Sequence, residues 1–112
     1  MVLLSAMFIF YSIHYPRPEK EALLVESMHQ FGELMNEQPG IVFVAPYPFK
    51  DPERGTVMGV SIWESEEAFQ AALSALQNRP KDPSSDEWEI RPPDVYMLHS
   101  ADSSLSANSG VS

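Results

Sequence analysis

The sequence predicts an α+β protein with the ferredoxin-like element order β-α-β-β-α-β, and three observations lead to this fold class. Four stretches are rich in β-branched and aromatic residues, two stretches between them carry apolar residues at helical spacing, and the third strand runs into the second helix without a loop. A chain of 112 residues with 44% hydrophobic content can build one core but not two. We therefore expect one domain over residues 1–99 and a Ser-rich tail over residues 100–112.

The first strand is predicted over residues 7–15 (MFIFYSIHY), where Pro16 stops it. The apolar start of the chain is too short to span a bilayer and lacks a basic leader region, so we interpret it as a strand. A helix over residues 19–37 follows. Its apolar residues Leu24, Met28, Phe31 and Met35 lie in a narrow arc opposite several glutamates, which is typical of an amphipathic helix packed on a sheet.

The second half of the chain contains two further strands, a second helix and a last strand. Pro39-Gly40 ends the helix, and strands over residues 41–47 and 56–63 are predicted to form a hairpin around a loop at 48–54. Ser65 is the expected N-cap of a helix over residues 66–76, whose first turn contains Glu66 and Glu67. A proline-rich loop that crosses an edge near Trp88 then leads to a last strand over residues 95–99.

The strands are apolar on both faces, which predicts a partner. Right-handed crossovers place both helices on one face of the sheet and leave the other face bare. Along the first strand, however, Ile9, Tyr11 and Ile13 alternate with Phe8 and Phe10, where a solvated face would show polar residues. We therefore expect a homodimer that forms through the sheet face and closes into a dimeric α+β barrel.

Composition excludes several classes of function. Seven basic against 16 acidic residues give a net charge of −9, which argues against nucleic-acid and membrane partners. The absence of cysteine excludes a thiolate nucleophile and fits a cytoplasmic location. The three histidines show no ligand spacing and no nucleotide-binding Gly loop is present, so we expect no metal and no cofactor.

The segments WESEEAF, PGI and RPPDVYML make residues 7–99 similar to the antibiotic biosynthesis monooxygenase family. The resemblance implies a dimeric α+β barrel, and one branch of the family forms quinones from phenolic substrates without a cofactor. The junction tryptophan of that branch matches Trp63, whereas its asparagine and tyrosine positions hold Gly59 and Phe69 here. The haem-degrading branch has an asparagine and a tryptophan where this chain has Ser12 and Ala72, so haem chemistry is not expected.

The resemblance implies that the strand face carrying Trp63 looks into a pocket between the sheet and the helices, which is the candidate site. Imidazole can take a phenol or enol proton near neutral pH, so His14 is the candidate base. We expect Trp63 and Phe69 to hold an aromatic ligand. Ser61 and Ser12 would orient its oxygen, and Gly59 would leave room for it.

Structural alternatives stay open, with Trp63 as a plain core residue and His14 as a strand-end histidine bonded to backbone or solvent. Whether the protein is an enzyme is open too. It is either a cofactor-independent monooxygenase for a small aromatic or polyketide-like molecule, or a non-catalytic small-molecule-binding or structural dimer.

Overall fold

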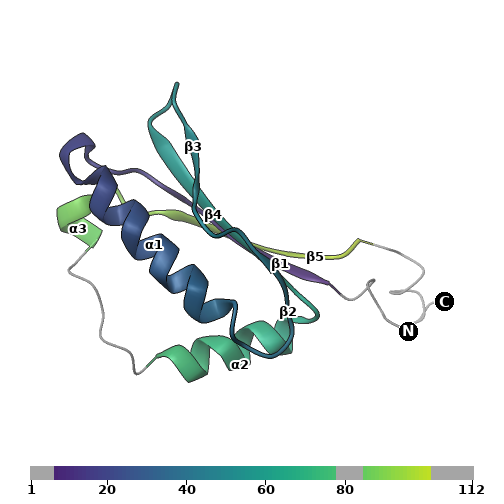
Figure 1. Ribbon diagram of the computed structural model, residues 1–112. Helices are drawn as coiled ribbons and strands as arrows, with labels where there is room; N and C mark the ends of the chain where they lie inside the picture. The colour runs from purple at the N-terminus through teal and green to yellow at the C-terminus, as the bar shows by residue number, and fades with distance from the viewer. Residues whose placement is uncertain (1–6, 78–84, 102–112) are drawn as a thin grey trace.

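The computed structural model describes residues 7–77 and 85–101. Its elements are β1 (Phe8–His14), the 3-10 helix η2 (Pro18–Lys20), α1 (Glu21–Met35), β2 (Ile41–Val44), β3 (Phe49–Asp51), β4 (Thr56–Trp63), α2 (Glu66–Leu76), the short α3 (Ser85–Trp88) and β5 (Asp94–His99). The strands form an antiparallel sheet in the order β2-β4-β1-β5, and β3 also pairs with β4. Figure 1 shows α1 and α2 on the same face of this sheet. The predicted α+β, ferredoxin-like fold is confirmed.

The segment predicted as a loop over residues 48–54 is partly a strand, and that prediction was wrong. Lys50 and Asp51 pair with Val57 and Thr56, so β3 adds a fifth strand. A tight turn makes this possible, because the Asp51 carboxylate accepts the backbone N–H groups of Glu53 and Arg54. Gly55 follows with a φ of 71°, a left-handed conformation that glycine adopts at little cost.

The structure differs from the predicted elements in two other places. The strand expected over residues 41–47 ends at Val44, and the loop before the last strand contains α3. The tail predicted over residues 100–112 lies almost entirely outside the described residues. Within the described part of the chain, no helix combines the length and apolarity needed to cross a bilayer.

The junction between β4 and α2 forms as the sequence predicts. The Ser65 side chain accepts a hydrogen bond from the backbone N–H of Ala68 at 3.1 Å, which satisfies one unpaired donor of the first helical turn. Because no loop intervenes, Trp63 at the end of β4 and Phe69 in α2 face the same interior. Their rings meet edge to face with centroids 5.7 Å apart.

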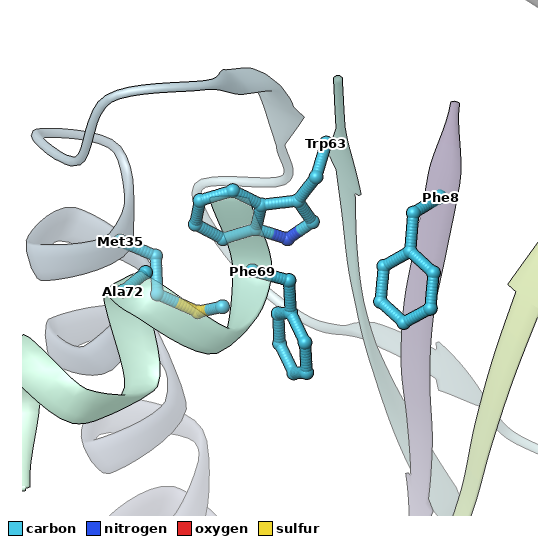
Figure 2. Close-up of a cluster of buried hydrophobic side chains, with 5 residues drawn as sticks. All are labelled: Phe8, Met35, Trp63, Phe69 and Ala72. Carbon is cyan, nitrogen blue, oxygen red and sulfur yellow. The ribbon is translucent and has the colours of Figure 1, made fainter. Parts of the chain in front are cut away.

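The core lies between α2, the end of α1 and the two central strands. Figure 2 shows its buried cluster of Phe8, Met35, Trp63, Phe69 and Ala72, each at most 3% exposed. Phe69 is its centre, since its ring lies 5.2 Å from that of Phe8 and stacks on Phe10 at 4.8 Å. Phe10 joins this cluster to the space under α1.

The opposite face of the sheet is apolar and uncovered by helices. Tyr11 pairs with Val60 on one side and with Tyr96 on the other, and the two tyrosine rings stack at 4.8 Å. Ile9 pairs in the same way with Ile62 and Leu98. The large side chains on this face or at its edges include Phe43, Phe49, Tyr96 and Leu98, which are 41–54% exposed. The predicted apolarity on both faces of the sheet is therefore confirmed.

Candidate functional site

A cavity of about 330 Å³ lies between α1 and the helix-facing side of the sheet. Most of its lining residues are apolar, and they include Phe10 on β1 and Leu24, Met28 and Phe31 on α1. Its polar wall groups are few, and they comprise Ser12, His14, Ser27, Ser61 and Glu89. An apolar chamber with a small number of convergent polar groups is typical of a small-molecule site.

β4 contributes two small residues to the cavity wall beneath α1. A Cβ atom placed on Gly59 would lie 3.0 Å from Cε of Met28, closer than most real contacts, so the missing side chain lets Met28 of α1 pack close to β4. Ser61, two residues further on the same face, is also small. Both residues line the cavity, and their role in giving a ligand room stays a prediction.

His14 ends β1 with both ring nitrogens engaged. Its Nδ1 atom lies 3.1 Å from Oε2 of Glu89, and its Nε2 atom lies 2.9 Å from Oγ of Ser12. The His14 side chain is 16% exposed and that of Glu89 only 2%. The His14 ring is therefore mostly buried and links the Ser12 hydroxyl to the Glu89 carboxylate.

Glu89 is held by the backbone just after β1 as well as by His14. Its Oε1 atom accepts the backbone N–H of Tyr15 at 3.0 Å, and the neighbouring backbone is tied by bonds from Ile90 N–H to Tyr15 O at 2.8 Å and from Arg17 N–H to Trp88 O at 2.7 Å. With Oε1 accepting from an N–H, the remaining oxygen is placed to accept the Nδ1–H of His14. This assignment leaves Nε2 of His14 unprotonated and able to accept the Ser12 hydroxyl proton.

Glu89 was not among the residues predicted from the sequence. The residue lies in a segment interpreted as loop, and no local spacing connects it with His14, from which it is 75 positions away. The one available signal was a glutamate between the large apolar residues Trp88 and Ile90, in a segment expected to cross an edge of the sheet.

Trp63 and Phe69 lie elsewhere. Both are 0% exposed in the core cluster, and neither lines the cavity formed by the described residues. The indole N–H of Trp63 donates to Oγ of Ser61 at 2.9 Å, so the core and the cavity meet at that serine. Contact between these two rings and a ligand stays a prediction, and it would require this part of the core to open.

The other two histidines are separate from the site. The His29 ring stacks on Tyr47 with centroids 4.0 Å apart, and its Nδ1 atom bonds to the carbonyl of Pro46. His99, at the end of β5, lies 3.5 Å from Glu66. Among residues 7–77 and 85–101, no group of three or more His, Asp or Glu side chains could hold a metal ion.

A polar cluster anchors β5 beside the site. The Tyr15 hydroxyl donates to the Asp94 carboxylate, and this bond raises the pKa of the tyrosine. Arg91 bonds to the other oxygen of Asp94 at 2.9 Å and lies over the Tyr15 ring at 4.3 Å. Glu89 and Asp94, the first and last residues of segment 89–94, are thus both bonded to residues at the end of β1 or just after it.

No protein-family model and no curated protein matches this sequence. Solved structures do match it in fold. The chain superposes on a cofactor-independent oxygenase, a variant of SnoaB from Streptomyces nogalater, with a TM-score of 0.65 and 14% identity over 83% of this chain and 91% of the other. It superposes on an antibiotic biosynthesis monooxygenase with a TM-score of 0.66 and 12% identity over 81% and 95%. Rv0793 from Mycobacterium tuberculosis gives 0.66 and 15% identity over 83% and 93%. The chain has the fold of the antibiotic biosynthesis monooxygenases.

Proposed function

We propose that the protein is a cofactor-independent monooxygenase that acts on a small aromatic or polyketide-like molecule in the cavity under α1. The observation that carries the proposal is the bonded pair of His14 and buried Glu89 in the wall of a mostly apolar cavity. A histidine oriented by a carboxylate is a suitable general base. The similarity in fold to SnoaB, a cofactor-independent oxygenase, supports the reaction class.

This chemistry requires a base and a dry, orienting cavity, because the deprotonated substrate is itself the reductant of O₂. Nε2 of His14 takes the phenol or enol proton, and the Glu89 carboxylate stabilises the imidazolium that forms. The hydroxyls of Ser12 and Ser61 orient the substrate oxygen. The substrate supplies the electrons, one oxygen atom of O₂ enters the product, and the other leaves as water.

We also propose that a second copy of the chain covers the open face of the sheet. That face carries Ile9, Tyr11 and Ile13 in its centre and exposed Tyr96 and Leu98 on β5. A contiguous apolar surface of this kind is uncommon on a protein that acts as a monomer. A sheet-to-sheet homodimer would bury it while leaving the cavity on the helix side of each subunit.

Oxygen uptake tests the proposed activity. With an anthrone as substrate and no added cofactor, the wild-type protein should consume O₂ faster than the spontaneous reaction, and His14→Ala should fall to the spontaneous rate. His99→Ala is the matched control, because His99 is an exposed strand-end histidine paired with Glu66. Wild-type uptake at the spontaneous rate would overturn the proposal.

If the wild-type protein shows no oxygen uptake above the spontaneous rate, the fluorescence of Trp88, which lines the cavity, tests whether the protein binds the ligand without catalysis. A saturable change on addition of the anthrone, absent from Trp88→Phe, would identify a non-catalytic small-molecule-binding protein.

A further inference from the structure

Ser12, His14 and Glu89 form a continuous hydroxyl–imidazole–carboxylate chain inside the cavity. Oγ of Ser12 lies 2.9 Å from Nε2 of His14, and Nδ1 of His14 lies 3.1 Å from Oε2 of Glu89. Ser12 is 9% exposed and Glu89 is 3% exposed, and all three residues line the same cavity. The order of the groups and the nitrogen that each one uses are those of a serine-hydrolase triad.

The bonds around Glu89 set the direction of proton transfer. Glu89 accepts from the Tyr15 N–H and from Nδ1–H of His14, so Nε2 of His14 is an acceptor that faces the Ser12 hydroxyl. A serine whose proton can pass to an adjacent, carboxylate-oriented imidazole is an activated nucleophile. Oxygenation does not need this feature, since a base alone suffices for it.

We propose that Ser12 is a nucleophile and that this cavity hydrolyses small esters or lactones with an apolar acyl group. Phe10, Met28 and Phe31 form the wall against which the acyl group packs. A volume of about 330 Å³ limits the substrate to a small molecule. This activity is distinct from the proposed oxygenation and does not depend on it.

The reaction balances with water as the sole co-reactant. Oγ of Ser12 attacks the carbonyl carbon while its proton passes to Nε2 of His14. Collapse of the tetrahedral intermediate breaks the bond to the leaving oxygen, which takes that proton from His14 and becomes an alcohol; this alcohol departs from an ester and stays attached to the acyl group of a lactone. Water then attacks the acyl-serine, gives its proton to His14, and the acid leaves as Ser12 regains its own.

Ser61 is placed to donate to the developing oxyanion. Ser12 is paired with Gly59 across the β1–β4 ladder, and Ser61 is the next residue of β4 on the same face, which makes it a diagonal neighbour of Ser12. No side chain stands between them at Gly59. Because Oγ of Ser61 accepts the indole N–H of Trp63, its own hydrogen can be directed toward the cavity.

Covalent labelling tests the nucleophile directly. Wild-type protein is incubated with diisopropyl fluorophosphate, its intact mass is measured, and the modified peptide is sequenced. We expect one equivalent of phosphoryl adduct, located on Ser12. Ser74→Ala, which removes an exposed serine of α2, should label like wild type. The absence of an adduct on Ser12 in the folded wild-type protein would overturn the proposal.

Turnover is measured with p-nitrophenyl acetate and p-nitrophenyl butyrate. Ser12→Ala should lower the rate at least 100-fold while its circular dichroism stays that of wild type, and Ser61→Ala should lower turnover more than it lowers labelling. Undiminished hydrolysis by folded Ser12→Ala would assign the reaction to an imidazole acting alone and overturn the proposal.

The oxygen-uptake assay tests the monooxygenase function independently of the labelling, which tests the hydrolytic function. Labelling without oxygen uptake would overturn only the monooxygenase function. Oxygen uptake without labelling would overturn only the hydrolytic one.

Discussion

Nδ1 of His14 and Oε2 of Glu89 lie 3.1 Å apart although the two residues are separated by 75 positions in the chain. An isolated bridge between Pro16, just after β1, and Glu89, in the segment before β5, brings them together. A carboxylate that accepts from Nδ1–H favours the tautomer with a free Nε2. The pair therefore decides which nitrogen of His14 faces the cavity.

Replacing this carboxylate should reverse the tautomer of His14. In Glu89→Gln the side-chain amide keeps the shape but can donate to Nδ1, which would leave Nε2 protonated and unable to act as a base. We expect the ¹⁵N chemical shifts of the His14 ring to show an unprotonated Nδ1 and a protonated Nε2, the reverse of wild type. Oxygen uptake should fall about 10²- to 10⁴-fold. Glu87→Gln, at an exposed position of α3, is the matched control. An unchanged tautomer in Glu89→Gln would refute this role of the carboxylate.

The open face of the sheet should control the oligomeric state. Leu98 on that face and Leu23 on α1 are 46% and 49% exposed, so an aspartate at either position meets a similar local environment in a monomer. In sedimentation at micromolar concentration, wild type should behave as roughly twice its 12.6 kDa mass. Leu98→Asp should dissociate or aggregate, because burying an unpaired carboxylate in the interface is costly, and Leu23→Asp should remain a dimer. A monomeric wild-type protein would remove the dimer proposal.

Gly59 should determine the size of the ligand. Adding a methyl group in Gly59→Ala forces Cε of Met28 to move, which the flexible end of a methionine can do, so the fold should survive while the cavity narrows. We expect the affinity for a three-ring aromatic ligand to fall about tenfold. Shortening the opposing side chain in the double variant Gly59→Ala/Met28→Ala should restore it. If the single variant binds the ligand as wild type does, the ligand lies elsewhere.

Replacing Trp63 should affect the stability of the fold more than it affects ligand binding. Its side chain is fully buried against Phe8 and Phe69, so Trp63→Ala should lower the free energy of unfolding by about 3–5 kcal/mol. Urea unfolding followed by circular dichroism measures this loss. A near-normal unfolding midpoint combined with weaker ligand binding would instead support a direct contact between the indole and the ligand.

The β3–β4 turn should show a pH dependence set by Asp51. The hydrogen bond from the Arg54 guanidinium, followed by the backbone N–H bonds, holds the pKa of Asp51 below its ordinary value. A lowered folded-state pKa means that this stabilisation is present above the unfolded-state pKa and is lost as the pH falls through the folded-state pKa. Carboxyl ¹³C titration should show the Asp51 pKa rising in Arg54→Gln, yet staying somewhat depressed by the backbone bonds. No change in Arg54→Gln would contradict the assignment to Arg54.

Much of the fold is encoded in patterns that operate over a few residues. Ser65 meets a helix N-terminus that needs a side-chain acceptor, and the apolar arc of α1 follows from its helical period. The alternation of Ile9 and Tyr11 with Phe8 and Phe10 specifies two apolar faces whatever covers them. These features were predictable because the interactions that cause them are local.

Only the tertiary structure decided the site. That His14 bonds to Glu89, that Trp63 is closed inside the core while Ser61 reaches the cavity, and that β3 lengthens the sheet all depend on how distant segments pack. Hydrophobic burial is nearly indifferent to direction, so a sequence shows that Trp63 is buried but not whether it faces a ligand or a neighbouring ring. A hydrogen bond, in contrast, requires two groups within about 3 Å, and across 75 positions only the completed fold supplies that distance.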